Sequence, residues 1–565
     1  TTTGWNISSA SATTYYWIGG TGNWSDNSHW SATSGGTSAG CAPSLNDNVI
    51  FDANSFSSTG QTVTMNVNGQ CNDMDWSAAT NSPTFAGGQK LEIGGSLSLT
   101  SAMTYNHTGQ LAFVSQDAET IDLAGHTIGS ASFFSGSNTQ GEWKLLSDFS
   151  VEENINFKSG AFVSNGYNVH ANKFETIQYR PRHFDFTNTE FIEIHELWRY
   201  NSGLDTLVID SATIKMVSDP NDQFKNMEFQ GGSRDYYDIY VDHTGNYGYQ
   251  IYFNGNNTFN DFEVHVNGEQ YLRDYGSNTV NNFSFYSTGS YVGSNVPRIY
   301  QHGSSTYQSF KTFNTGAYRP ELWLYSSNTL GVFDIDAGYI VNIGAGQTQT
   351  ADTIIMVGSC TESIDLQSSS AGSAGTISVS SGTINTEYTN LKDITATGGA
   401  TFNAVGAIDG GNVSGWNITS IPATNYYWVG GGGNWDDPGH WSTSSGGSGG
   451  TCNIPSFQDN VFFDVNSFTS AGGQVTINVD ASCKSMTWNG VQGTPYFYST
   501  WQNSLSVYAS MLLDSNMNMS LQGPVYFESD TAGNIIDTKG KQFYNVYFNG
   551  QNHPDGEWTL PSALN

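Results

Sequence analysis

A tryptophan- and glycine-rich block occurs twice in this chain. The segment YYWIGGTGNWSDNSHW at residues 15–30 returns almost unchanged as YYWVGGGGNWDDPGHW at residues 426–441. An offset of 411 residues relates Trp17 to Trp428, and the sequence GWNI precedes both blocks, at 4–7 and at 415–418. Because self-similarity at a fixed distance is the signature of a tandem array, the fold of this chain must accommodate successive copies of one unit.

Short alternating strands are the main secondary-structure signal. Val63, Met65 and Val67 alternate with polar residues, whereas no segment shows clear helical periodicity. Turn dipeptides such as Asn165-Gly166 separate the apolar runs by only a few residues. The sequence therefore predicts an all-β protein.

A six-residue pattern recurs inside the large repeat: apolar, any residue, Asn/Asp/Ser, apolar, any residue, apolar. Its fourth position is Phe262, then Phe283 after 21 residues and Phe310 after 27, and Phe333 follows 23 residues later. These intervals suit the coils of a parallel β-helix, in which like residues stack in inward-facing ladders and a small polar residue lies at a bend. Strands of a β-sandwich alternate similarly and are the alternative. The copies read CNDMDW (71–76), FKNMEF (224–229), FNDFEV (259–264), VNNFSF (280–285), CKSMTW (483–488) and FYNVYF (543–548), and two looser copies with one added residue read YQSFKTF (307–313) and YTNLKDI (388–394).

These repeats predict the domain organisation. Residues 1–14 match the tail of a preceding repeat, residues 15–425 form one complete repeat, and residues 426–565 form the N-terminal part of the next. Within the complete repeat we expect a tryptophan-rich joint over 15–56 and a β-solenoid over 57–418. At about 23 residues per coil, one repeat would hold roughly 18 coils and form an elongated rod on the order of 85 Å. We therefore expect the chain to be an internal segment of a longer protein.

The charge balance excludes some partners. Lys and Arg number 18 against 50 Asp and Glu, which gives a net charge of −32, and no apolar run approaches the length of a membrane span. Because such an acidic chain repels nucleic acid and anionic membrane surfaces, we expect no nucleic-acid partner and no membrane insertion.

Four of the five cysteines occur as two pairs at matching places. We predict one disulfide between Cys41 and Cys71 and another between Cys452 and Cys483, because the spacing is too wide for a zinc knuckle and the composition suits a secreted protein. Four free buried thiols are the alternative. Cys360 is left over, and we expect it to be buried or to pair with a cysteine outside this segment.

The tryptophan-rich block itself suits a cap or joint between repeats. Its glycines permit unusual backbone angles and its tryptophans bury large areas, whereas a sugar-binding role would leave Trp24 and Trp30 exposed. His29 and His440 are expected to be packed and hydrogen-bonded. The tyrosine-rich stretch 236–253 could likewise stack on sugars, although half-buried strands require the same residues. A packing role at the joints is predicted for Trp5, Trp17, Trp24, Trp30, Trp416, Trp428, Trp435 and Trp441.

Acidic residues that recur at matching places are candidate calcium ligands. Calcium could be held by their carboxylates and by backbone carbonyls, but Asp47 could instead begin the strand DNVIFD by bonding to its own turn. No EF-hand loop is present, and no other cofactor is expected. The recurring residues are Asp26, Asp47, Asp52, Asp437, Asp459 and Asp464.

Candidate catalytic residues are few. Glu193 with Glu196 beside His195, and Asp334 with Asp336, are pairs of carboxylates of the kind that glycosidases use. Solvent-facing strand positions give the same pairs without any chemistry, and no nucleophile-elbow, zinc-protease or phosphate-loop pattern is present. We therefore predict no catalytic residue and no enzymatic activity.

The ends of the repeat resemble a known family. The block at 15–30, DNVIFDANSF at 47–56, CNDMDW at 71–76 and AIDGGNVSGWNI at 407–418 are similar to the repeat of very large secreted surface proteins of bacteria, notably Bacteroidetes and their relatives. This resemblance implies an extracellular, β-rich fibre or adhesin with many repeats and a separate secretion or sorting domain. It brings no catalytic residues, and it does not extend to the middle of the repeat, about 179–346.

The expected function follows from the repeat and from this resemblance. We expect a structural segment of a giant extracellular protein that forms a filament, stalk or adhesin at a bacterial cell surface. Its partners would be the neighbouring repeats, other copies in a filament, and a glycan or other surface target. The alternative is a β-helix that binds or cleaves polysaccharides, as phage tailspikes and lyases do.

Overall fold

The computed structural model describes residues 12–136, 141–177, 180–200, 205–218, 226–243, 250–267, 270–288, 296–316, 318–360, 362–420, 422–450, 452, 454–469, 471–549 and 556–561. In these residues the secondary structure is strand, apart from two short 3-10 helices. The chain divides into two compact units. The first unit comprises 1–355, 366–382 and 393–400, and the second comprises 356–365, 383–392 and 401–565.

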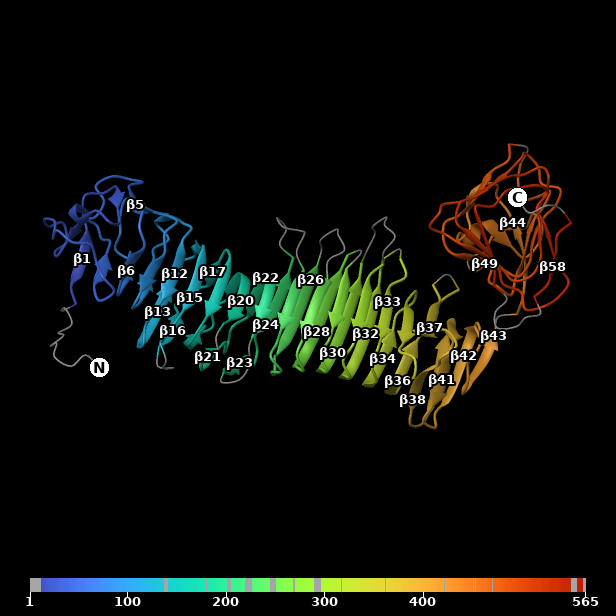
Figure 1. Cartoon of the computed structure of the whole chain (residues 1–565), viewed down its shortest axis with the longest axis horizontal. Helices are drawn as coiled ribbons and strands as arrows, with labels where there is room; N and C mark the ends of the chain where they lie inside the picture. Colours follow the sequence, from blue (N-terminus) through green and yellow to red (C-terminus); the bar gives the residue numbers. More distant parts are fainter. Residues whose placement is uncertain are drawn as a thin grey trace. The chain divides into compact units, whose positions relative to one another are not determined.

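The first unit is a β-solenoid whose coils have three faces (Figure 1). The coils place strands on successive faces, and apart from the edge strand β3 the strands pair in parallel with their counterparts in neighbouring coils. The all-β prediction and the parallel solenoid are therefore confirmed, and the sandwich is excluded. The first face contains β3 (Trp30–Ser31), β1 (Thr14–Trp17), β4 (Asn48–Ile50), β7 (Met74–Asp75), β10 (Leu97–Ser98), β13 (Ala118–Asp122), β16 (Glu142–Leu145), β19 (Gly160–Val163), β21 (Arg182–Asp185) and β23 (Thr206–Val208).

The third face is the longest continuous ladder. Its pairing runs without interruption from the coil that follows the first tryptophan-rich block to residue 343. It contains β6 (Gly69–Cys71), β9 (Leu91–Ile93), β12 (Gln110–Phe113), β15 (Ser130–Phe133), β18 (Asn154–Phe157), β20 (Val169–Thr176), β22 (Phe191–Arg199), β25 (Met227–Gln230), β27 (Gln250–Asn254), β29 (Tyr271–Asp274), β31 (Arg298–Gln301), β33 (Glu321–Leu324) and β35 (Ile340–Ile343).

The second face begins with short strands and continues in longer ones. It contains β2 (Gly22–Asn23), β5 (Thr62–Met65), β8 (Thr84–Gly87), β11 (Thr104–His107), β14 (Thr127–Ile128) and β17 (Phe149–Val151), then parts of β20 and β22, then β24 (Thr213–Val217) and β26 (Asp238–His243), and finally β28 (Thr258–Val266), β30 (Thr279–Ser287), β32 (Thr306–Asn314) and β34 (Asn328–Ile335). The last coils of the unit add β36 (Thr348–Met356), β37 (Ile364–Ser368), β38 (Gly375–Val379) and β41 (Ile394–Thr397).

The polar third position of the six-residue pattern lies at a bend within the long strands. In β28 both Asn260 and Asp261 face outward between the buried Phe259 and Phe262, and the pairing of β28 with β30 skips Asn260. Two outward residues in succession break the alternation of a straight strand. Each long strand therefore turns a corner and serves two faces, so the predicted bend is confirmed.

The predicted phenylalanine ladder is present in register. Phe262 pairs with Phe283, Phe283 with Phe310, and Phe310 with Phe333. All four side chains are at most 2% exposed, and the rings of Phe283 and Phe310 stack with centroids 4.6 Å apart. Unequal loops between the strands absorb the unequal sequence intervals, so the apolar column continues from coil to coil.

A polar ladder that the sequence did not reveal runs beside it, inside the same coils. The side-chain oxygen of Asn278 accepts a hydrogen bond from the backbone N–H of Asn257, one coil earlier in the chain. In the same way Ser305 accepts from the N–H of Asn278 and Asn328 from that of Ser305, all over 2.8–2.9 Å. Asn328 then donates to Gln349 over 2.8 Å. Burial raises the pKa of the neighbouring Asp274, which accepts bonds from Asn278, to about 7. Each coil therefore satisfies the corner backbone of the one before it.

The second unit repeats the start of the solenoid. Its first face contains β46 (Trp441–Ser442), β44 (Asn425–Trp428), β47 (Asn460–Phe463), β50 (Met486–Trp488), β53 (Met511–Leu512), β56 (Asn534–Asp537) and β58 (Trp558–Thr559). The second face contains β45 (Gly433–Asn434), β48 (Gln474–Ile477), β51 (Tyr496–Ser499) and β54 (Asn518–Leu521), and the third contains β49 (Ala481–Cys483), β52 (Leu505–Val507), β55 (Pro524–Phe527) and β57 (Asn545–Phe548). A separate sheet precedes these faces and contains β39 (Thr383–Glu387), β42 (Thr401–Ala407) and β43 (Trp416–Ser420), and β40 (Thr389–Lys392) lies nearby in the chain.

The division into units does not coincide with the repeat boundary. The second unit begins inside the last coils of the complete repeat, with residues 356–365, and continues through the second tryptophan-rich block. Over both units the described chain makes about 20 turns. This number is lower than 23 residues per turn would give, because long loops such as the one between β3 and β4 lie within some turns.

Copies of the six-residue pattern lie on different faces. The fourth residue of FNDFEV, Phe262, is on the second face, whereas the fourth residue of FKNMEF, Met227, pairs with Ile251 on the third. In the second unit, Met486 of CKSMTW is on the first face and Val546 of FYNVYF on the third. The pattern therefore indicates a solenoid strand without indicating which face the strand joins.

The phenylalanine ladder yields a stability prediction. Phe283→Ala should lower the free energy of unfolding by about 3–5 kcal/mol, because it removes a buried ring that packs against rings in the coils on both sides. The control Asn281→Ala changes an exposed side chain of the same strand and should alter stability by less than about 0.5 kcal/mol. Urea unfolding followed by tryptophan fluorescence measures both, and equal effects would contradict the ladder.

Candidate functional site

The first tryptophan-rich block folds into a compact aromatic cluster. The ring of Trp17 stacks on His29 at 4.6 Å and meets Trp30 edge-on at 5.0 Å, and Trp30 in turn meets Trp24 edge-on at 4.9 Å. The indole N–H of Trp17 donates to the carbonyl of Gly20 over 2.7 Å, and that of Trp30 to the carbonyl of Trp24 over 2.9 Å. Each large ring is therefore buried with its polar atom satisfied.

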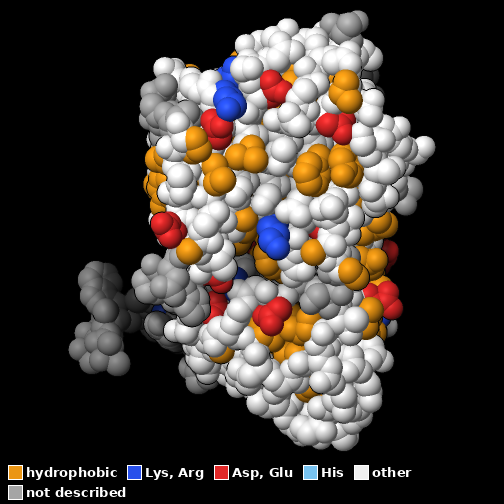
Figure 2. Space-filling model, turned by 90° about the vertical axis from the view of Figure 1, so that its right-hand side faces the viewer, with side chains coloured by type: hydrophobic (Ala, Val, Ile, Leu, Met, Phe, Trp, Pro, Cys, Tyr) orange, Lys and Arg blue, Asp and Glu red, His pale blue; other side chains and the backbone are white. Residues whose placement is uncertain are grey.

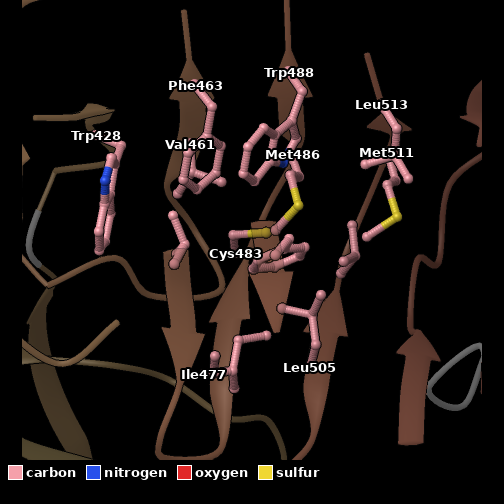
Figure 3. Packing of buried hydrophobic residues seen from close by; sticks show 14 of the residues in the cluster. Trp428, Val461, Phe463, Ile477, Cys483, Met486, Trp488, Leu505, Met511 and Leu513 are labelled. Atoms are coloured by element: carbon pink, nitrogen blue, oxygen red, sulfur yellow. The ribbon is translucent and has the colours of Figure 1, made fainter. Parts of the chain in front are cut away.

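The second block has the same geometry to within small differences. Trp428 stacks on His440 at 4.7 Å, Trp441 meets Trp428 at 5.0 Å and Trp435 at 4.8 Å. Figure 3 shows Trp428 in one row with Phe463 and Trp488 of the following coils. The repeated sequence thus encodes a repeated packing unit.

The glycines of the block make room for the histidine. A Cβ on Gly22 would lie 2.2 Å from Nε2 of His29, and a Cβ on Gly433 would lie 2.0 Å from Nε2 of His440. The histidine cannot easily move away, because its ring is stacked on a tryptophan and Nδ1 of His29 is 2.6 Å from the carbonyl of Ile18. The expectation that the histidines are packed and hydrogen-bonded is confirmed.

Each block closes one end of the first face. The two-residue strand β3 pairs antiparallel with β1 at the edge of the face, and β46 pairs with β44 in the same way. A very short antiparallel edge strand offers little backbone for further pairing. Since β1 and β4 are already in register with the next coils, the solenoid begins inside the segment predicted as a joint.

The burial of the tryptophans decides between packing and sugar binding. Trp24 and Trp30 are 2% and 0% exposed, so the alternative in which both stack on a sugar is wrong. The predicted packing role holds for Trp17, Trp24, Trp30, Trp428, Trp435 and Trp441, all of which are buried. Trp416 is partly exposed and packs on Phe402 at 5.0 Å, and Trp5 lies outside the described residues.

Both predicted disulfides are wrong. Cys41 is an exposed free thiol, whereas Cys71 is a buried free thiol at the end of β6. Cys483 is likewise buried and free, and it packs among apolar side chains such as Met486 (Figure 3). Burial raises the pKa of the Cys71 and Cys483 thiols, which keeps them protonated. The bridge joins Cys452 to Cys360 instead, across 92 residues of the chain.

The recurring aspartates act as turn caps. Asp47 accepts bonds from the N–H of Thr13 and from the N–H and hydroxyl of Ser44, and Asp459 makes the same three bonds to Thr424 and Ser456. Two of the others, Asp26 and Asp437, cap the short 3-10 helices η1 (Asn27–His29) and η2 (Pro438–His440). The remaining two, Asp52 and Asp464, accept from the N–H groups of Asn54 and Asn466.

With these contacts, the six recurring aspartates do not gather into one cluster of carboxylates. In the described part of the chain, no three His, Cys, Asp or Glu side chains come together in a group that could hold a metal ion. Calcium at these aspartates stays a prediction. If calcium is held there, chelation of divalent cations should lower the melting temperature and added calcium should restore it, which calorimetry can follow. An unchanged melting temperature would show that calcium bound at these aspartates does not stabilise the fold.

The candidate catalytic carboxylates are engaged in ion pairs. Glu193 lies 3.7 Å from Nδ1 of His170 and 3.6 Å from Nε2 of His195, and the hydrogen bond with His170 lowers the pKa of Glu193. Glu196 is 2.6 Å from the Lys173 ammonium. Each glutamate therefore contacts a basic side chain of the neighbouring coil, His170 for Glu193 and Lys173 for Glu196.

The second candidate pair is similar. Asp334 lies 3.8 Å from Nζ of Lys311, and burial raises the pKa of Asp334. Asp336 accepts bonds from the N–H groups of Asn314 and Ala337 over 2.7 and 3.0 Å. These bonds assign the pair a turn-capping and coil-bridging role.

Aromatic side chains also stack along the outside of the middle coils. His302 lies between Tyr275 and Tyr325, at 4.7 and 4.8 Å with nearly parallel planes, and Tyr286 lies between His265 and Phe313 at 4.4 and 4.5 Å. A sugar stacks on the open face of a ring, but in both ladders the faces of the central ring are covered by its neighbours. In the tyrosine-rich stretch Tyr236 is buried, which fits the strand reading of that segment.

A buried ion pair was not foreseen from the sequence. Arg182 donates from Nε and Nη2 to Oδ2 of Asp205 over 2.9 and 2.7 Å, with both side chains at most 2% exposed. Nη1 of Arg182 also donates to the carbonyls of Phe157 and Ile177. The pair therefore links three coils. A local sequence pattern could not predict it, because the two charged residues are 23 positions apart in the chain.

Comparison of the chain with protein-family models, with curated proteins and with solved structures finds no match. None of the described helices is long and apolar enough to cross a membrane. The likeness of the repeat ends to bacterial surface proteins therefore stays a prediction that rests on the quoted motifs.

The glycine under the histidine yields a second prediction. Gly22→Ala should lower the free energy of unfolding by about 1–3 kcal/mol, because the new methyl group must displace His29 from Trp17. Gly88→Ala is a matched control, because its Cβ would meet only the Thr108 hydroxyl at 3.4 Å. Chemical denaturation compares the two variants, and a Gly22→Ala chain as stable as the control would contradict the packing.

Proposed function

We propose that this chain is a structural segment of a giant extracellular repeat protein that forms a filament, stalk or adhesin at a bacterial surface, and that it is not an enzyme. The observation that carries the proposal is the recurrence of a capped solenoid start in one chain, with the aromatic cluster repeated 411 residues later and the aspartate turn caps 411 or 412 residues later. A tandem copy multiplies length and valency.

The chemistry of the surface supports the same proposal. Figure 2 shows one face on which acidic side chains stand singly among uncharged ones, with few basic residues. The candidate carboxylates are held by neighbouring cations or turn N–H groups. The Cys360–Cys452 bridge is of a kind that persists in oxidising compartments, which favours a location outside the cytoplasm.

Length is the property that tests the proposal. Insertion of one further copy of residues 15–425 after residue 425, directly before the second block, should lengthen the particle by one constant step on the order of 85 Å. A second insertion should add the same step. Electron microscopy of single particles measures the contour lengths, and an unchanged length would overturn the proposal.

A polysaccharide-binding or polysaccharide-cleaving β-helix is the second candidate. The observation in its favour is the row of outward aromatic residues, which includes Trp323 beside Tyr325 at 5.7 Å. Glycan arrays and a reducing-end assay separate the two candidates. Release of oligosaccharide that is lost in Asp334→Asn or Glu193→Gln would favour this candidate, whereas a constant length step without glycan release would favour the structural role.

A further inference from the structure

The disulfide joins two different copies of the repeat. Cys360 lies near the C-terminal end of the complete repeat, after β36, and Cys452 lies in the loop between β46 and β47 of the following copy. Both cysteines belong to the second unit. The bridge therefore fastens the end of one repeat to the tryptophan-rich block of the next.

Cys41 occupies the place of Cys452 in the first copy. It lies in the loop between β3 and β4, and the strands that flank the two loops have the same partners. Asp47 fixes the chain that enters the first block as Asp459 fixes the chain that enters the second, through the N–H of Thr13 and of Thr424. The two loops are thus held by the same framework.

The thiol of Cys41 is accessible. It is exposed, and its Sγ lies 3.0 Å from the Tyr15 hydroxyl at the margin of the block. Cys71 and Cys483, in contrast, lie inside the core in both copies. Of the three thiols that are free in the described residues, only Cys41 can therefore reach a partner outside its own solenoid.

We propose that the position of Cys41 and Cys452 is a general acceptor for a disulfide from the preceding copy of the repeat, so that every joint in the array is covalently closed by a cysteine equivalent to Cys360. This inference rests on the proposed repeat array and adds its linkage. The partner of Cys41 is then the coil segment 356–365 of another copy.

The step needs an oxidant, for which a low-molecular-weight disulfide such as oxidised glutathione suffices. One block thiolate attacks that disulfide, its sulfur–sulfur bond breaks, and one glutathione thiolate leaves. The thiolate at the position of Cys360 then attacks the mixed disulfide and releases the second glutathione. Two protein thiols are oxidised, one oxidant disulfide is reduced to two thiols, and two protons pass to water or to those thiols.

The test uses the full chain extended by one copy of residues 15–425 after residue 425. It is purified with oxidised and reduced glutathione, alkylated, digested and mapped by mass spectrometry. We expect two bridges, Cys360 with the inserted counterpart of Cys41, and the inserted counterpart of Cys360 with Cys452. Protection of the inserted counterpart from alkylation should match that of Cys452, while Cys41 itself stays modified.

Control variants make the result decisive. Cys360→Ser in the first copy alone should expose the inserted counterpart of Cys41 to alkylation and leave the other bridge intact, which also shows that the chain is folded. An alkylated counterpart beside an intact bridge to Cys452, or a counterpart bonded to Cys71, would overturn the proposal. The length step of the array is measured separately, so the linkage can fail while the array stands.

Discussion

In-register stacking of coils is the constraint on which this structure depends. Parallel pairing places each residue directly over its counterpart in the next coil, as the column of Phe262, Phe283, Phe310 and Phe333 shows. The same geometry also stacks polar and charged residues. It produces the column of Asn and Ser whose side chains accept hydrogen bonds from backbone N–H groups at the corners, and it produces the ion pairs between neighbouring strands. A solenoid of this kind gains stability with each coil, because each coil buries its face only against its neighbours.

Stacking also creates the problem that the tryptophan-rich block solves. A stack of coils has an open end, where apolar rings and strand edges would meet water or another chain. At the N-terminal end of the stack, the block buries Trp17, Trp24 and Trp30, and it ends the first face in a two-residue antiparallel strand. Glycines beneath the histidine are required because the cluster is packed too closely for a side chain there.

The sequence contained enough information to predict the coils and the caps. Aromatic periodicity predicted the ladder register at Phe262 and Phe283, and the repeated block predicted a packed cluster. The face that each strand joins was beyond reach, because Met227 and Phe262 share a local pattern and differ only in what stacks on them. The internal column through Asn278 and the Arg182–Asp205 pair could not be predicted for the same reason. Their partners lie one coil away, and loops of unequal length make the number of residues per coil irregular.

The wrong disulfides have an instructive cause. Matching spacing suggested that each copy closes its own bridge, but Cys71 and Cys483 end strands of the third face with their side chains inside the core, where they behave as small apolar residues. If each disulfide lay within one repeat, neighbouring repeats would be joined covalently only by the backbone between them. A bridge from Cys360 to Cys452 instead links one copy to the next, so a load applied along the chain would be carried by the bridge as well as by the 92 residues between its ends. Cys360, which the sequence pattern left without a partner, is thus the cysteine that links its repeat to the next one.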